Sequence, residues 1–185
     1  MTNYKTMLDF NYTQLVDYLN KKYGKVPGSY FCRENFKSIN QKIKRGKDGL
    51  SIHHVKEIEI PLLSQKHNAE KYSFSYQKSE NLVYCDYIEH TLLHVLIYEN
   101  HKNKAKSDDF DGFFIMQSLF LSDYYRGYDF KRINYIQQAN TLNDNIELFE
   151  SLFERVNHKD IIDNCKIDYA ARVRQILAKN NANRQ

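Results

Sequence analysis

The sequence has few cysteines and no long apolar segment. Its 185 residues contain only three cysteines, which are widely spaced and include no Cys-x-x-Cys pair. An odd number of isolated cysteines argues against a disulfide framework and against a structural zinc knuckle. No run approaches the roughly 18 apolar residues of a membrane span, and the residues from Met1 to Phe10 do not have the pattern of a signal peptide. We therefore expect a cytoplasmic protein with no membrane segment.

The rest of the composition is that of a globular protein. Tryptophan is absent, but 15 tyrosines and 11 phenylalanines supply aromatic side chains. A hydrophobic fraction of 42% and a charged fraction of 27% are ordinary values. A chain of this length forms one domain, or one domain with an accessory piece, and is long enough to bury a core.

The most informative pattern lies between residues 50 and 94. His53 and His54 end a short β-like run, and a second apolar run begins directly after Asn81. His90 and His94 follow, four residues apart, which places both imidazoles on one face of a helix, where they can bind one metal ion. Taken singly, each histidine has the alternative of a partly buried polar residue. All five residues in this order favour a site.

This residue set suits the hydrolysis of phosphodiesters. The reaction needs an activated water and a group that stabilises charge on the phosphate and the leaving oxygen. A metal ion meets the second need. A histidine meets the first, because a base works best when its pKa lies near the operating pH. One metal ion and one histidine that is not a ligand are a minimal set for the reaction.

The order His-His, Asn, His-x-x-x-His resembles the HNH nuclease motif, also called the ββα-metal motif. The spacing Asn-x8-His-x3-His is similar to that of its colicin-type subgroup. The resemblance implies a strand that carries the histidine pair, a loop to a second strand, and a helix that completes the site. It implies that His54 is the general base and that Asn81 braces the turn between the strands. It also implies one divalent ion (Mg²⁺, Mn²⁺, Ni²⁺ or Zn²⁺) held by His53, His90 and His94.

Two features depart from the family pattern. The loop from His54 to Asn81 is longer than in compact versions of the motif, and Gln77 to Glu80 replaces the usual glycine-rich turn. Within this loop, Glu57 or Glu59 has two interpretations. One of them approaches the metal or orients a ligand histidine, or both form the polar side of an extended segment.

Positive charge is concentrated before the histidine pair. Nine basic residues face a single acid, Glu34, between Lys21 and Lys47. An anionic partner should meet this part of the chain first, and the alternative is a solvated basic surface. Its position beside the histidine pair favours DNA as the partner. The candidate nucleic-acid contacts are Lys37, Lys42, Lys44, Arg45 and Lys47.

We predict an α+β fold in which a two-stranded antiparallel element and one helix form a ββα-metal core within a mainly helical domain. The predicted regions are a basic N-terminal helical region (1–49), an HNH-like core (50–101) and a C-terminal helical accessory region (108–180). Apolar periodicity and end signals predict helices. Their ranges are Tyr12–Tyr23, Asn35–Lys44, Asp86–His101, Phe113–Tyr125, Leu142–Val156 and Asp160–Lys179.

Two functions are consistent with the sequence. The first is a metal-dependent HNH endonuclease that hydrolyses phosphodiester bonds in DNA. The alternative is an HNH-fold binding or inhibitory protein, such as an anti-defence or regulatory protein of a phage or other mobile element, which binds protein or nucleic acid without cleaving it. In either case the C-terminal helices are candidates for binding a protein partner. A pure binder has no need to keep all five site residues, so the sequence favours the nuclease.

Overall fold

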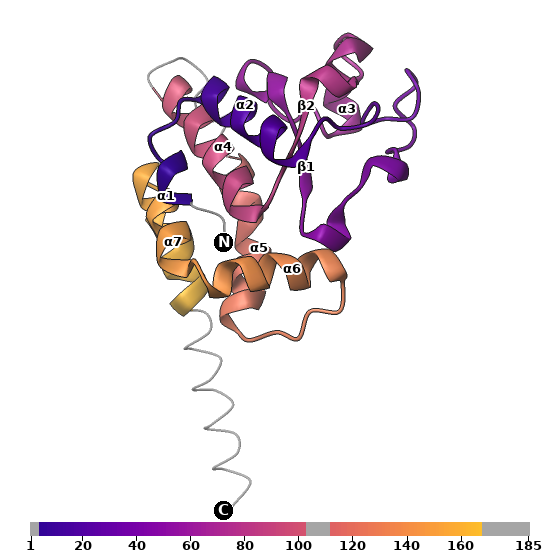
Figure 1. Ribbon diagram of the computed structural model, residues 1–185. Coiled ribbons are helices and arrows are strands. Elements are labelled where there is room, and N and C mark those ends of the chain that lie inside the picture. Colours follow the sequence, from indigo (N-terminus) through magenta and orange to yellow (C-terminus); the bar gives the residue numbers. More distant parts are fainter. Residues whose placement is uncertain (1–3, 103–111, 168–185) are drawn as a thin grey trace, which may run out of the picture.

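The computed structural model describes residues 4–102 and 112–167. The chain is mainly helical around one small antiparallel sheet, which confirms the predicted α+β class (Figure 1). A further helix runs through residues 159–167. The main elements in chain order are α1 Tyr4–Met7, α2 Tyr12–Tyr23, β1 Ser51–His54, α3 Lys66–Ala69, β2 Leu82–Cys85, α4 Tyr87–His101, α5 Gly112–Tyr125, α6 Ile133–Asn143 and α7 Ile146–Arg155. Short 3₁₀ helices lie between them: η1 Gln41–Ile43, η2 Gly46–Asp48, η3 Val55–Ile58, η4 Phe74–Gln77 and η5 Ser79–Asn81.

The sheet consists of β1 and β2, and it orients the histidine pair. His53 lies opposite Val83, and His54 lies opposite Leu82. Consecutive residues of a strand face opposite sides of the sheet. Val83 accordingly belongs to the main core, whereas Leu82 belongs to a smaller apolar cluster. The two adjacent histidines therefore enter different surroundings.

A turn at Gly49 leads the chain into β1. Gly49 has a φ of 77°, a left-handed conformation that glycine adopts without the steric cost of a side chain. A Cβ atom at this position would lie only 3.2 Å from the Cβ of Gln137 in α6. The glycine thus lets the entry to the first strand pack closely against a helix from the C-terminal part of the chain.

Helix α4 begins at a tightly bonded N-terminus. Asp86 is the N-cap, and it forms a capping box with Glu89, in which each side chain accepts from the other residue's backbone N–H, at 2.9 and 2.8 Å. Tyr4 donates a further hydrogen bond to Asp86, and Lys22 pairs with the buried carboxylate of Glu89 at 2.5 Å. These bonds fix the first turn of the helix, from which His90 follows directly.

One hydrophobic core joins the three predicted regions. Helix α4 crosses the middle of the molecule, with α2 on one side and α7 on the other (Figure 1). The main cluster includes Leu15 from α2, Leu93 from α4 and Phe149 from α7, all fully buried. Across the described part of the chain, no helix combines the length and the apolar character needed to cross a membrane.

Helix α2 lies where periodicity predicts it, α5 covers its whole predicted range, and α4 follows its predicted cap. The helix predicted for Asn35–Lys44 is wrong. Phe36 has a φ of 53°, and Phe31 pairs with Ile39 in an isolated bridge. Apolar residues at helical spacing are divided here between two clusters, because Phe36 packs beside Phe31 whereas Ile43 packs against the sheet. Tertiary packing therefore overrides the local period.

The helix predicted for Leu142–Val156 is also wrong in its bounds. The helix is interrupted between Asn143 and Ile146, so that α6 ends and α7 begins within the predicted range. Asn145 bonds back to Thr141 with its side-chain amide, which satisfies a carbonyl at the end of α6. Of the C-terminal region predicted for 108–180, residues 108–111 and 168–180 lie outside the described residues.

Candidate metal centre

Three imidazoles meet where β1 passes α4. The ring centroids of His53 and His90 are 5.3 Å apart, those of His53 and His94 are 5.1 Å apart, and those of His90 and His94 are 5.0 Å apart. One ring nitrogen from each residue lies within 4.8 Å of the others. The helical spacing places two donors on one face of α4, and the strand brings the third to them. Imidazole nitrogens gathered in this way can hold a divalent metal ion.

Tyr12, the first residue of α2, sets the orientation of His53. The Tyr12 hydroxyl donates to the carbonyl oxygen of Val55, at 2.9 Å, and also contacts Nε2 of His53 at 2.9 Å. Because the hydroxyl proton is used on Val55, Nε2 of His53 is the donor in the second bond. Nδ1 of His53 is then unprotonated, and among the described residues it has no hydrogen-bond partner. The buried lone pair of this nitrogen is therefore available to a metal ion.

Gln77 sets the orientation and the protonated nitrogen of His54. The amide nitrogen of Gln77 donates to the carbonyl oxygen of Leu63 at 3.2 Å, so that its Oε1 faces Nε2 of His54 at 2.8 Å. Nε2 of His54 must donate in this bond, which leaves Nδ1 as an unprotonated base. Within residues 4–102 and 112–167, this nitrogen is buried and has no hydrogen-bond partner. Tyr30 packs edge-on against the ring, with centroids 4.6 Å apart.

Glu57 lies beside the cluster, which decides between the two interpretations of this loop residue. The short helix η3 turns the chain back after β1 and buries the carboxyl group. Its Oε2 is 3.4 Å from Nδ1 of His53 and 3.8 Å from Nε2 of His94. Glu59, in contrast, is exposed and pairs with Lys56.

Burial controls the protonation of these groups. It lowers the pKa of His54 and of His90 to about 4, although the hydrogen bond to Gln77 partly opposes the shift at His54. The pKa of His54 is therefore below the near-neutral value that the sequence predicts for a base, because its ring is buried. Burial, and then the neighbouring imidazoles, hold the pKa values of His53 and His94 well below their ordinary range. Burial also raises the pKa of Glu57 to about 7. The histidines are thus neutral near pH 7, which is the form that binds metals.

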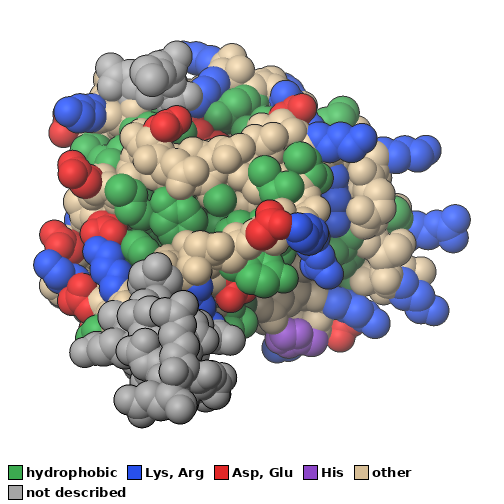
Figure 2. All heavy atoms as spheres, turned by 90° about the horizontal axis from the view of Figure 1, so that it is seen from below, with side chains coloured by type: hydrophobic (Ala, Val, Ile, Leu, Met, Phe, Trp, Pro, Cys, Tyr) green, Lys and Arg blue, Asp and Glu red, His purple; other side chains and the backbone are tan. Residues whose placement is uncertain are grey.

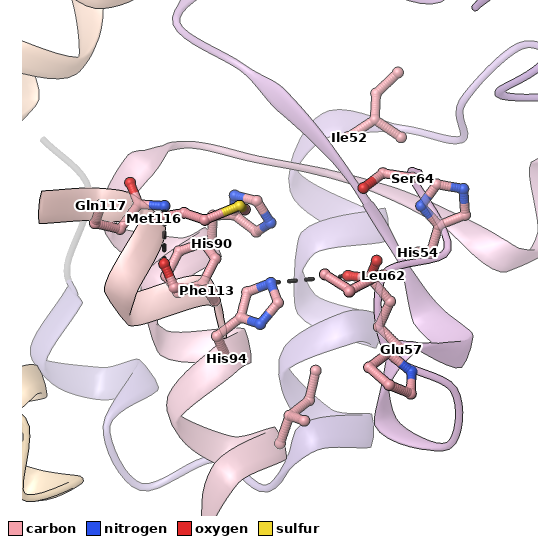
Figure 3. Close-up of a pocket in the computed structure, with 12 residues that line it drawn as sticks. Ile52, His54, Glu57, Leu62, Ser64, His90, His94, Phe113, Met116 and Gln117 are labelled. Atoms are coloured by element: carbon pink, nitrogen blue, oxygen red, sulfur yellow. Dashed lines mark hydrogen bonds and ion pairs between the residues drawn. The ribbon is translucent and has the colours of Figure 1, made fainter. Parts of the chain in front are cut away.

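A pocket of about 140 Å³ gives access to the cluster. His90 and His94 project from α4 on one wall, and His54 and Glu57 lie on the opposite wall (Figure 3). Phe113 of α5 stacks on the ring of His94, with centroids 3.8 Å apart and planes 5° apart. The candidate base and two of the candidate ligands therefore face one space.

Asn81 lies in the loop that leads into β2, and it does not line the pocket. Its side-chain amide donates to the carbonyl oxygen of Ser75 at 2.9 Å, and its backbone N–H bonds to Lys78. These bonds tie the end of the loop together just before the second strand. The residue thus acts on the backbone of the loop and is not part of the histidine cluster.

The candidate nucleic-acid contacts lie outside the pocket. Lys37, Lys42, Lys44 and Lys47 are exposed. Arg45 is half-buried, and it bonds to Asp48 at 2.8 Å and to the carbonyl oxygen of Tyr23 at 3.3 Å. Arg45 is therefore a structural residue as well as a positive charge.

Viewed from below, Lys and Arg side chains gather along one edge of the molecule (Figure 2).

Several residues of the site have no signal in the sequence. Tyr12 bonds to His53 from 41 residues away, and Gln77 bonds to His54 from 23 residues away.

A groove of about 630 Å³ lies beside the pocket and is also not predicted by the sequence. It shares Met116 and Gln117 with the pocket and is lined in part by Lys131 and Arg132. Such contacts depend on the packing of separate elements, which no local pattern encodes.

Comparison with known proteins adds no relative, because no family model, no curated protein and no solved structure matches this chain. The interpretation of the site therefore depends on its own residues and their geometry.

Proposed function

We propose that the chain is a metal-dependent endonuclease of the HNH type, which hydrolyses phosphodiester bonds in DNA. One observation carries the proposal. Three imidazoles converge on one point, while a fourth histidine on the other wall of the same pocket keeps an unprotonated, buried nitrogen. A purely structural cluster of histidines needs no such division into ligands and a base. We also propose that β1, β2 and α4 form a ββα-metal core.

The three-histidine set fits a divalent ion. Nδ1 of His53 is a buried lone pair that no described residue satisfies with a hydrogen bond, and a metal ion is a suitable partner for it. His53, His90 and His94 would hold the ion. When bound, it supplies stabilisation of the negative charge that develops on the phosphate and the leaving oxygen.

The residues of the chain supply the proton transfer. Nδ1 of His54 accepts a proton from a water molecule, whose oxygen forms the new bond to phosphorus. The bond from phosphorus to the leaving oxygen breaks, and that oxygen takes a proton from solvent. Oε1 of Gln77 accepts the hydrogen bond from Nε2 of His54 before and after this proton transfer. The bond holds the ring in place and stabilises the imidazolium.

Positive charge on the segment around η2 and just before α6 supports DNA as the substrate. The segment around η2 packs against α6, whose N-terminus follows Lys131 and Arg132. Those two residues line the groove that continues from the pocket, and Lys42, Lys44 and Lys47 lie exposed on the neighbouring segment. Side chains of this kind bind phosphates without reading sequence.

Plasmid nicking tests the proposal. We expect cleavage with Mg²⁺, Mn²⁺ or Ni²⁺ and none with EDTA, and we expect His54→Ala to lose it. His67→Ala is the matched control, because His67 is an exposed histidine on α3 outside the pocket. If both variants cleave as well as the parent chain, His54 is not the base.

A further inference from the structure

We propose that Glu57 is a fourth ligand of the metal ion, which makes the centre a three-histidine, one-carboxylate site for a first-row transition metal ion. The inference rests on the metal centre of the proposed function and adds to it a donor from outside the motif. It is carried by the placement of one carboxylate oxygen between two of the three imidazoles.

The distances are those of neighbouring ligands on one ion. Zinc bonds to imidazole nitrogen and carboxylate oxygen are about 2.0–2.2 Å long, so that two donors on a tetrahedral ion are separated by about 3.3–3.6 Å. Oε2 of Glu57 is 3.4 Å from Nδ1 of His53 and 3.8 Å from Nε2 of His94. These separations are longer than ordinary hydrogen bonds. The separation from His53 falls within the range for a coordination shell, and the separation from His94 is about 0.2 Å longer than its upper limit.

The carboxyl group is held so that this oxygen faces the histidines. Its other oxygen, Oε1, accepts from the backbone N–H of Leu63 at 3.0 Å. That bond anchors the side chain on the loop that follows η3 and leaves Oε2 directed at His53 and His94. In Figure 3 the interaction between His94 and Glu57 spans the pocket from one wall to the other.

The charge of the site also suits a cation. Glu57 is only 7% exposed, and among the described residues it has no ion pair with a lysine or arginine, while the two imidazoles beside it are neutral. A buried carboxylate without a positive partner is costly. A divalent ion supplies the missing charge. Three imidazoles and one carboxylate favour Zn²⁺, Co²⁺ or Ni²⁺, whereas Mg²⁺ prefers a shell of oxygens. Zinc can expand to five ligands, so that a phosphate oxygen of the proposed substrate would take the fifth position.

Metal titration of the full chain tests the inference without any cleavage assay. Zn²⁺ affinity is measured by competition with a chromogenic chelator, and the visible spectrum of bound Co²⁺ reports the ligand shell. We expect Glu57→Gln to weaken Zn²⁺ binding at least about tenfold, since even partners outside the ligand shell contribute about 10–100-fold, and to change the Co²⁺ spectrum. Glu57→Asp, which keeps a carboxylate, should recover part of the affinity.

Glu59→Gln is the matched control, because Glu59 is exposed and two residues away. It should bind both metals as the parent chain does. Parent-like Zn²⁺ affinity and Co²⁺ spectrum in Glu57→Gln would overturn the role of Glu57 alone, with the three-histidine centre left standing. If the parent chain binds neither ion, the metal centre and this inference are both wrong.

Discussion

The histidine pocket and the basic segment at residues 37–47 differ in how their side chains are held. In the pocket, Tyr12 and Gln77 fix which nitrogen of each neighbouring histidine carries the proton. Among the candidate nucleic-acid contacts of the segment, Lys42 and Lys47 extend into solvent, whereas Arg45 is tied to the fold by its bond to Tyr23. The chemistry of bond cleavage needs atoms fixed to a fraction of an ångström. Attraction of a polyanion needs only charge near its path.

Alanine at His90 and at His54 should produce the largest effects, and should produce different ones. His90→Ala removes a ligand, so that affinity for Zn²⁺ or Ni²⁺ falls together with cleavage, and excess metal partly restores cleavage. His54→Ala leaves the ligands intact, so that metal still binds while cleavage falls about a hundredfold or more. Calorimetry beside plasmid nicking measures both quantities. Loss of metal binding in His54→Ala with normal binding in His90→Ala would reverse the two roles.

Tyr12→Phe should weaken the pocket without touching a ligand. The change removes the acceptor for Nε2–H of His53 and leaves the ring of residue 12 in the core. Partners of this kind contribute about 10–100-fold to metal affinity, and we expect a loss in that range for Zn²⁺. Tyr18→Phe, on the same helix and packed beside Phe10, is the control. Equal affinities in the two variants would show that His53 needs no such partner.

Charge reversal in the basic segment should act more weakly and more uniformly. With glutamate at Lys42, Lys44 and Lys47, we expect weaker DNA binding across all sequences, because each lost phosphate contact lowers the salt slope by about 0.9. Metal affinity should not change. Lys159→Glu, on a distant exposed helix, is the control. Unchanged affinity and slope at moderate salt would identify the segment as a solvated surface.

Acid should destabilise the metal-free protein, because the buried histidines of the pocket take up protons less readily than those of the unfolded chain. The pKa values of His54 and His90 are about 4 in the folded state against an ordinary value of 6.5, so the unfolded chain takes up these protons first. Stability should therefore be lost as the pH falls from about 6.5 towards 4. Glu57, with its pKa raised to about 7, acts in the opposite direction, but as one group against several. Urea unfolding in EDTA at several pH values measures the balance, and stability that rises on acidification contradicts it.

The sequence predicts the parts of the site that depend on local structure. The four-residue spacing of His90 and His94, and the cap at Asp86, are properties of one helix, and the structure has both. The sequence leaves the place of Glu57 open, because its carboxyl group is positioned by the hydrogen bond that it accepts from the backbone of Leu63. Tyr12 and Gln77 could not be predicted, since each contact joins segments that only the folded core brings together.

Helix boundaries show the same limit in the rest of the fold. Periodicity predicts α2 to the residue, because one face of that helix packs on one core. It fails at Phe36, whose ring packs beside Phe31 in a cluster of their own. A pattern of apolar residues predicts that side chains are buried, but it does not predict that they are buried in the same cluster.

The central claim is that one metal ion binds among the three imidazoles. Crystals soaked in Mn²⁺ or Zn²⁺ and measured at the absorption edge of the metal locate the ion directly. We predict one anomalous peak about 2.0–2.2 Å from a nitrogen of each of His53, His90 and His94, with Oε2 of Glu57 as the fourth donor. The absence of a peak there, or a peak held by other residues, would contradict the account.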